Sequence, residues 1–481
     1  LNGTNSFSLE TSTLPPLNLG KRLNYLIKYP HGCIEQTVSS VFPQLYLADV
    51  MEISTELENE IQENIEAAME RLMSFQLSSG GFSYWPGRSD ANSWGTTYAG
   101  HFLLEAEKKG YTLPVGMKEK WVRYQSRQAK RWSVKNTGWL TLDQAYRLYT
   151  LALSGNEEMG AMNRMREAKY LTKQAIWRLA AAYALVGKES IAKSMVDDTD
   201  WEIKDYSELA YTYGSKVRDQ AMILETLGLL SMHDDALPLL EKISERLSSR
   251  RWMSTQSTAY SLLGIVSFVN GSSISDGEMN FDYSINGNAN KVFTDSKIWK
   301  VDQVLSDEAN VSLNIKNNSK GLLYMSLATR GVPLENKLEA DSKGMLMEVK
   351  YQDLKGNDID VADLVQGTDF KVIVSVKNTG AVAYKEMVIE QIFPSGWEIL
   401  NTRMLEVGGT HMKDTPEYQD IRDDRVYTYF DLNIGKTKEF VVLLNAAYLG
   451  DYFLPAVKSE AMYDNRIYAR NKGQWVQVSK D

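Results

Sequence analysis

Residues 29–36 read Tyr-Pro-His-Gly-Cys-Ile-Glu-Gln, and this stretch holds the only cysteine among the 481 residues of the chain. Cys33 and Gln36 are three positions apart, a spacing that places two side chains on the same face of a first helical turn. The Cys33 sulfur can therefore displace ammonia from the Gln36 carboxamide and leave an intramolecular thioester. Gly32 permits the tight backbone entry that brings the two groups together. Water must be kept away from an activated acyl group of this kind.

The residues alone are also compatible with two different roles for Cys33. Free cysteine is among the most buried residue types, so Cys33 could be an inert core residue. His31, two positions earlier, would suit a cysteine hydrolase, although no protease-type motif surrounds the cysteine. A single cysteine excludes an internal disulfide framework, and four scattered histidines without a cysteine pair predict no zinc site.

Composition narrows the class of protein. The net charge of −9 argues against a nucleic-acid partner, which would favour a basic face. No apolar run approaches the roughly 18 residues of a membrane-spanning helix. We predict no metal and no cofactor. The chain begins Leu1-Asn2-Gly3, with neither an initiator methionine nor a signal peptide, so we expect a mature piece or an excised fragment.

Residues from about 16 to 268 carry the apolar periodicity of helices. The expected helices are 17–29, 34–51, 56–76, 94–109, 118–132, 142–153, 175–195, 217–232, 237–247 and 255–269. Five related pairs recur along them: Thr97-Tyr98, Ala145-Tyr146, Ala182-Tyr183, Ala221-Met222 and Ala259-Tyr260. After a first interval of 48 residues their spacings are 37, 39 and 38, which predicts one helix hairpin per repeat. Such hairpins can close into an α/α toroid or form an open solenoid, and the periodicity is the same for both.

From about Gly271 the apolar residues alternate with period 2, as in strands. The expected strands are 281–285, 311–315, 322–327, 370–376 and 387–393. A break with a proline at 331–334 and the polar run to Lys343 predict a linker between two β modules. Residues 6–10 are also strand-like but lie far from the other strands, which a helical domain inserted into a β domain would explain. We expect Tyr84 and Trp85, in the glycine-aromatic loop 80–87, to fill the core of the helical domain.

The Gly-Cys-x-Glu-Gln run resembles the thioester motif of the alpha-2-macroglobulin and complement family. Further stretches resemble bacterial members: residues 15–47, 80–87, 252–256, 423–426 and 460–463. The resemblance implies a multidomain α + β fold, in which an α/α toroid thioester domain is inserted in a CUB-like β domain and a macroglobulin-like, receptor-binding β-sandwich follows. The expected ranges are 1–14 for the N-terminal strand of the CUB-like domain, 15–270 for the toroid, 271–340 for the rest of the CUB-like domain and 345–481 for the sandwich.

The same resemblance assigns roles to individual residues. Cys33 and Gln36 would form the thioester, with Gly32 and Glu35 supporting the motif. Tyr29, Met462 and Tyr463 match positions that shield the thioester in bacterial relatives. For Met462 and Tyr463, ordinary sandwich core is the competing interpretation.

The function implied is stoichiometric inhibition of proteases, with no enzymatic turnover. In the family, a protease cuts a bait region, domains rearrange, and a lysine amine of the protease attacks the Gln36 acyl carbon. Residues 130–143 lack the histidine that complement proteins use to esterify hydroxyls, so aminolysis is expected. The resemblance further implies a monomer in the periplasm or cell envelope, with any membrane anchor upstream of this chain. A non-covalent binding module without an intact thioester, or an enzyme on an α/α toroid, are the alternatives.

Overall fold

The computed structural model describes residues 3–28, 32–133, 135, 138–270, 278–305, 311–333, 338–400 and 414–480. The chain divides into two compact units, Leu1–Leu334 and Glu335–Asp481. The first unit contains the helices and two small sheets, and the second contains only strands. None of the helices in the described ranges has the length and apolar character needed to cross a bilayer.

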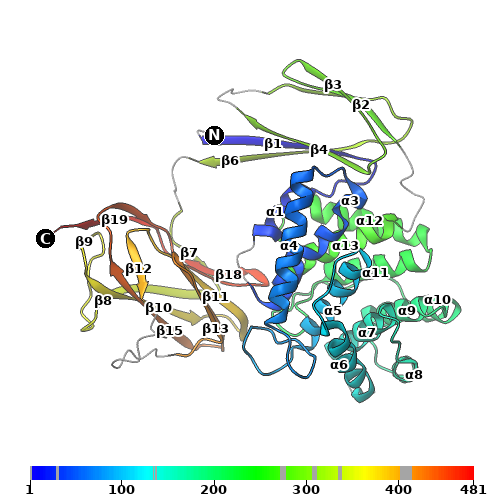
Figure 1. Cartoon of the computed structure of the whole chain (residues 1–481), viewed down its shortest axis with the longest axis horizontal. Helices are drawn as coiled ribbons and strands as arrows, with labels where there is room; N and C mark the ends of the chain where they lie inside the picture. The colour runs from blue at the N-terminus through cyan, green and yellow to red at the C-terminus, as the bar shows by residue number, and fades with distance from the viewer. Residues whose placement is uncertain are drawn as a thin grey trace. The chain divides into compact units, whose positions relative to one another are not determined.

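The helices of the first unit form a closed ring of hairpins (Figure 1). Within the described ranges, six inner helices follow one another around the ring, and the last packs against the first. The inner helices are α2 (Ile34–Val41), α5 (Ser93–Lys108), α7 (Trp139–Leu153), α9 (Lys173–Leu185), α11 (Lys216–Leu229) and α13 (Thr255–Asn270). Because α13 contacts α2, the domain is a toroid and not an open solenoid.

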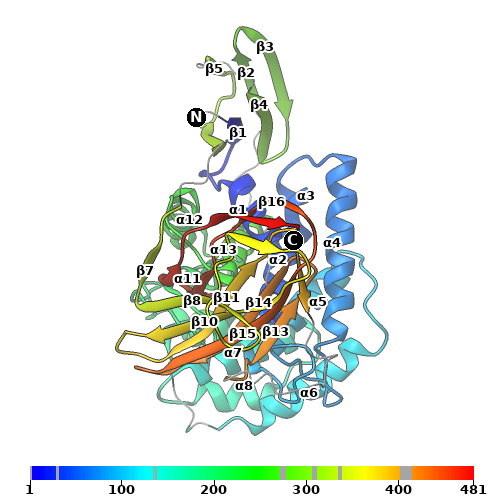
Figure 2. The same cartoon turned by 90° about the vertical axis from the view of Figure 1, so that its left-hand side faces the viewer.

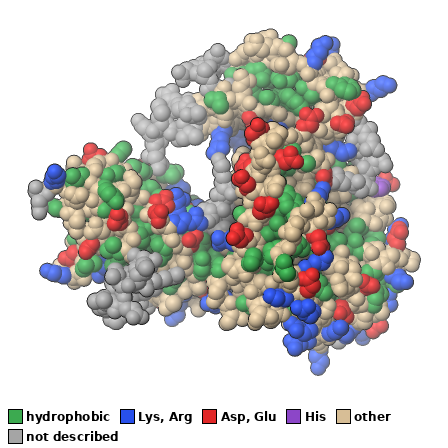
Figure 3. All heavy atoms as spheres, in the orientation of Figure 1, with side chains coloured by type: hydrophobic (Ala, Val, Ile, Leu, Met, Phe, Trp, Pro, Cys, Tyr) green, Lys and Arg blue, Asp and Glu red, His purple; other side chains and the backbone are tan. Residues whose placement is uncertain are grey.

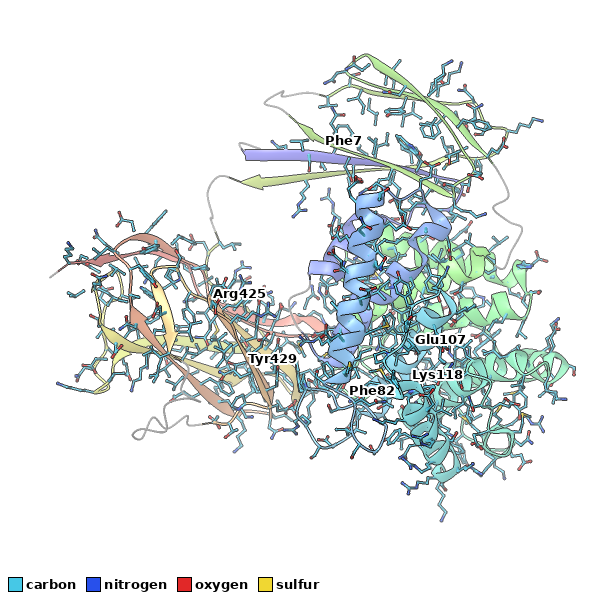
Figure 4. All side chains as sticks on the ribbon, in the orientation of Figure 1. Phe7, Phe82, Glu107, Lys118, Arg425 and Tyr429 are labelled. Carbon is cyan, nitrogen blue, oxygen red and sulfur yellow. The ribbon has the colours of Figure 1, made fainter. Side chains whose placement is uncertain are left out.

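An outer helix lies beside each inner one. The outer helices are α1 (Leu19–Lys28), α4 (Thr55–Met73), α6 (Met117–Arg131), α8 (Met159–Arg166), α10 (Glu189–Val196) and α12 (His233–Ser248). Each is amphipathic and buries one face against the ring. On α6, Lys120, Arg123 and Arg127 are exposed, and Figure 3 shows basic side chains gathered over this helix. Figure 4 shows Lys118 of α6 beside Glu107 of α5. The two side chains form an ion pair between these helices.

The recurring pairs in the sequence all lie on inner helices, so one repeat corresponds to one hairpin. The ring centroids of Tyr98 and Tyr260 are 5.2 Å apart, and those of Tyr146 and Tyr260 are 6.2 Å apart. Small residues let neighbouring inner helices approach closely. A Cβ on Gly264 of α13 would lie 2.6 Å from the carbonyl oxygen of Ala221 on α11.

Three helix predictions were wrong in detail. The helix expected at 34–51 is α2 followed by a 3-10 helix, η1 (Phe42–Tyr46), and a short α3 (Leu47–Val50), because Pro43 has no N–H for an α-helical bond. The helix expected at 175–195 divides into α9 and α10 at Gly187, whose φ of +73° ends a helix. Helix α8 was not predicted, because its eight residues give too short a periodic run.

The strands of the first unit form two three-stranded sheets (Figure 2). The N-terminal strand β1 (Gly3–Ser12) lies between β4 (Ile298–Leu305) and β6 (Tyr324–Pro333), antiparallel to both. The other sheet contains β3 (Asn288–Thr294), β2 (Met279–Ile285) and β5 (Leu313–Asn317), and Asn286-Gly287 at positive φ turn the β2–β3 hairpin. A strand before the toroid therefore pairs with strands after it, which confirms the predicted insertion.

The predicted linker at 331–343 contains the boundary between the two units, after Leu334, but it is shorter at both ends than expected. Strand β6 continues through Pro333, and β7 (Asp341–Lys343) begins pairing in the second unit within the run expected to be a linker. Strand β6 lies at the edge of its sheet, so one of its sides has no neighbouring strand. Edge strands tolerate proline, because an N–H on the open side has no partner in the sheet.

The second unit is a β-sandwich. One sheet has the order β12-β15-β10-β8, another β13-β14-β11-β17-β18-β7, and a small third sheet β16-β19-β9. The strands are β8 (Met345–Asp353), β9 (Asp363–Val365), β10 (Asp369–Asn378), β11 (Tyr384–Ile392), β12 (Trp397–Leu400), β13 (Tyr418–Ile421), β14 (Arg425–Leu432), β15 (Thr437–Ala446), β16 (Gly450–Leu454), β17 (Lys458–Ala461), β18 (Asp464–Arg470) and β19 (Gln474–Ser479). The rings of Phe430 and Phe440 meet across the two main sheets with centroids 4.8 Å apart.

Replacing Leu9 by alanine should destabilise the β domain of the first unit. Leu9 is fully buried in the core with Phe7 and Ile285 (Figure 4 labels Phe7), and such truncations cost about 2–4 kcal/mol. Hydrogen exchange of the β4 and β6 amides would report the loss locally. Val304→Ala, on an exposed position of β4, is the matched control and should change little. If the β4 and β6 amides lost the same protection in both variants, Leu9 would not be a core residue of this β domain.

Candidate thioester site

Cys33 caps the N-terminus of α2. Its backbone is extended (φ −65°, ψ 165°), and its Sγ accepts a hydrogen bond from the Gln36 N–H at 3.4 Å. Gln36 is the third residue of the helix, the position from which a Glu or Gln side chain can reach back to the N-cap residue. Cys33 is 0% and Gln36 2% exposed. One helical turn thus carries a buried thiol and, three positions later, a buried carboxamide.

The end of the Arg71 side chain occupies the space beside Gly32. Arg71 of α4 donates a hydrogen bond from Nη2 to the Gly32 carbonyl at 3.0 Å. A Cβ on Gly32 would lie only 2.0 Å from the same nitrogen. The side chain of any other residue here would displace the Arg71 guanidinium from the entry to α2.

Glu35 points into the toroid and ties α2 to α13. Its fully buried carboxylate accepts a hydrogen bond from Ser39 at 2.6 Å and contacts the Thr255 hydroxyl at 3.0 Å through each oxygen. Ser39 in turn lies 3.1 Å from the Tyr98 hydroxyl. Thr255 belongs to a stretch that resembles bacterial relatives, yet its contact with Glu35 could not be predicted from the sequence. Glu35 thus connects the first inner helix, α2, to the last, α13, through its carboxylate.

The loop between α4 and α5 holds the residue that follows the cysteine. The carbonyl of Tyr84 accepts a hydrogen bond from the Ile34 N–H at 3.1 Å. Phe82 (labelled in Figure 4) and Trp85 of this loop are buried, as expected of residues that fill the core, whereas Tyr84 is half-buried. The sequence did not reveal the contact with Ile34, because a backbone hydrogen bond requires no particular side chain.

Three different elements therefore hold the backbone around Cys33. Helix α4 holds Gly32, the 80–87 loop holds Ile34, and α13 holds Glu35. Reacting groups that are fixed in this way need little reorganisation before they react.

The predicted shielding residues are placed only in part. Tyr29 and His31 lie outside the described residues. Met462 and Tyr463 form the two-residue tip between β17 and β18, and each is 2% exposed, which both shielding and sandwich core would produce. The Met462 N–H donates to the Glu386 carbonyl at 3.0 Å, and Glu386, at a bulge of β11, has a φ of +53°. Bulges of this kind re-aim neighbouring side chains.

Other titratable groups of the toroid are buried and paired with one another. Arg178 binds Glu225 at 2.7 Å and lies 4.2 Å from the Tyr149 ring centroid. Burial alone would raise the pKa of Glu225, but Arg178 lowers it overall. Burial lowers the pKa of His101 to about 4, and its Nδ1 is 2.9 Å from the Tyr146 hydroxyl. These groups stabilise the interior of the ring, so they add no support for a toroid enzyme.

Two family profiles match this chain. Residues 9–146 match the A-macroglobulin TED domain, and residues 344–465 match the Bacterial Alpha-2-macroglobulin MG10 domain. The first profile covers the thioester turn, and the second covers Met462 and Tyr463.

Curated relatives are alpha-2-macroglobulins of bacteria. The Escherichia coli protein is 23% identical over 491 residues, covering 93% of this chain and 28% of the relative. The Xylella fastidiosa protein is 25% identical over 494 residues, covering 95% of this chain and 29% of the relative. The chain thus spans less than a third of the length of either.

Solved structures share the fold. Native Escherichia coli alpha-2-macroglobulin, spanning domain MG7 to the C-terminus, superposes with a TM-score of 0.82 at 22% identity, covering 99% of this chain and 77% of that one. Salmonella alpha-2-macroglobulin reacted with methylamine gives a TM-score of 0.83 at 22% identity, covering 99% of this chain and 32% of that one.

Replacing Thr255 by valine should weaken the connection between α13 and α2. The substitution keeps the shape but removes the hydroxyl that donates to the buried Glu35 carboxylate. We expect the free energy of unfolding of the toroid to fall by about 1.5–3 kcal/mol in denaturant titrations. Thr258→Val is the control on the same helix, because the Thr258 hydroxyl donates only to the local Ser254 carbonyl. If both variants lost the same stability, Glu35 would not depend on Thr255.

His101 should make stability fall in mild acid. Well above pH 6.5 neither state binds the His101 proton, so the lowered pKa has no effect on stability there. As the pH falls from 6.5 towards 4, the unfolded chain gains a proton that the folded chain excludes, and the free energy of unfolding decreases. Between pH 7 and 4.5 we expect the wild type to lose about 2 kcal/mol more than His101→Gln in denaturant titrations. Parallel pH profiles would contradict the buried, neutral histidine.

Proposed function

Because the chain belongs to the bacterial alpha-2-macroglobulin family, we propose that it traps proteases covalently through a thioester between Cys33 and Gln36. One observation carries the proposal: the N-cap Cys33 and the third helical residue Gln36 are buried on a single turn whose backbone three elements hold. An inert core cysteine would need neither the glutamine at that position nor the backbone contacts around it.

The bond forms by acyl transfer within the turn. The Cys33 sulfur attacks the Gln36 carboxamide carbon, the C–N bond breaks, and the thiol proton leaves with the nitrogen as ammonia. In the trapping step, a neutral lysine amine of the protease attacks the same carbon. An amide bond forms, the C–S bond breaks, and a proton from the amine ends on the Cys33 sulfur. The N-terminus of α2 stabilises that sulfur while it carries negative charge.

The shield is part of this proposal. Tyr29, four residues before the cysteine, and the Met462–Tyr463 tip would cover the acyl group until a protease triggers its exposure. Aromatic and thioether side chains exclude water without offering a nucleophile, which an activated acyl group requires. The support is the resemblance of these three positions to the shielding positions of bacterial relatives.

Amines are the proposed nucleophiles. The Salmonella relative is described as reacted with methylamine, and residues 130–143 of this chain contain no histidine to assist a hydroxyl. A periplasmic or cell-envelope location, where a bacterium meets foreign proteases, is proposed with this function.

Covalent capture tests the proposal. The intact protein is incubated with an excess of a trypsin-like protease and separated on denaturing gels. We expect protease-containing conjugates with the wild type, and none with Cys33→Ala or with a protease whose lysines are reductively dimethylated. Conjugates that persist with Cys33→Ala would contradict the thioester. Complete absence of conjugates with the wild type would favour the non-covalent binding module.

A further inference from the structure

The loop that precedes α11 contains two strained residues. Tyr211 and Tyr213 have φ values of +66° and +50°, in the left-handed region that non-glycine residues rarely adopt. Such strain persists only where the surroundings hold it, and it concentrates at functional sites. Tyr213 is 3% exposed, so its side chain has a packing role inside the toroid.

Two contacts of the Tyr213 side chain connect it to the first turn of α2. The ring stacks on Tyr84, with centroids 5.3 Å apart and planes at 26°, and the Tyr84 carbonyl accepts the Ile34 N–H. The Tyr213 hydroxyl accepts a hydrogen bond from Asn92 at 3.1 Å. Tyr213 thus supports the loop that holds the residue next to Cys33.

Asn92 connects Tyr213 to Ile34 through the first turn of α5. Its side chain caps α5 by accepting the Gly95 N–H at 2.7 Å. A Cβ on Gly95 would lie 2.6 Å from the Ile34 side chain, so this first turn of α5 lies directly against Ile34. The backbone and the side chain of Ile34 are therefore both held by groups that Tyr213 contacts.

A buried arginine fixes the strained loop from the other side. The Arg218 guanidinium is fully buried and donates to the Thr212 carbonyl at 2.9 Å and to the Thr212 hydroxyl at 3.1 Å. It binds Asp219 at 2.7 Å and lies 4.5 Å from the ring centroid of Trp94 on α5. The Gly214 carbonyl also accepts the Glu208 N–H at 3.0 Å. Tyr213 is therefore held rigidly between this network and the Tyr84 loop.

We propose that Tyr213 is a positioning residue for the thioester: by stacking on Tyr84 and binding Asn92, it holds Ile34 and so keeps Cys33 and Gln36 in register. The inference rests on the proposed function, because it concerns the same bond. It adds a residue that lies 180 positions from the cysteine in the sequence. Its loss should loosen the turn and admit water, which speeds hydrolysis of the bond and lowers the fraction of chains that carry it.

The test compares thioester lifetime among variants of the intact protein. In Tyr213→Ala we expect the Cys33 thiol to appear roughly tenfold faster in buffer than in the wild type, since an aromatic pair and a hydrogen bond are lost. Tyr213→Phe keeps the stack and should restore most of the lifetime. Tyr213→Leu keeps the volume without the stack and should resemble alanine, so a folding failure of the alanine variant leaves the test intact.

Tyr183→Ala is the matched control. Tyr183 is also fully buried, but it binds Asn163 at 2.7 Å and packs beside Arg166 on α8, away from α2. We expect it to lower the thermal midpoint of unfolding while leaving the thioester lifetime unchanged. Hydrogen exchange should show faster exchange of the Ile34 amide in Tyr213→Leu and unchanged exchange in Tyr183→Ala.

The outcomes separate the two claims. Equal thiol release in Tyr213→Leu and Tyr183→Ala, or release at the wild-type rate in Tyr213→Leu, overturns the positioning role and leaves the proposed function standing. A wild-type protein of full mass whose folded Cys33 reacts with a thiol reagent overturns the proposed function itself.

Discussion

The hydrogen bonds that join Thr255 to the Glu35 carboxylate are the constraint on which the rest of the site depends. They connect the last inner helix of the toroid to the first, across 220 residues of sequence. The connection adds to the packing of α13 against α2 that closes the ring, and it holds the first turn of α2, where Cys33 and Gln36 lie. A buried carboxylate without these donors would be costly, so ring closure and the geometry of the turn stabilise each other.

This arrangement supports the proposal that the first turn of α2 keeps a reactive bond away from water. Inner helices are surrounded on all sides, so a turn at the end of one of them can be held from several directions. Arg71 reaches Gly32 from an outer helix, Tyr84 reaches Ile34 from a loop, and α13 reaches Glu35 from the far end of the domain. The two residues of the proposed bond are close in sequence, but the groups that hold their turn come from distant parts of the ring.

The sequence was informative where the chemistry is local. The forty-residue repeat and the strand-like start at 6–10 predicted the helix hairpins and the inserted domain, and the i, i+3 spacing placed Cys33 and Gln36 on one helical turn. It was uninformative where distant elements meet: ring closure depends on α13 contacting α2, and the roles of Tyr84 and Tyr213 depend on a backbone bond and a ring stack. Only the start of the linker was misplaced, because the sequence does not show that β6 is an edge strand, in which Pro333 is tolerated.

The central claim is that Cys33 and Gln36 are joined in the folded protein. Intact mass and thiol titration, before and after treatment with methylamine, test it most directly. The account predicts an untreated chain lighter by one ammonia with no reactive thiol, and after treatment a methylamide at Gln36 together with one free thiol at Cys33. An untreated, folded chain of full mass with a titratable Cys33 would contradict it.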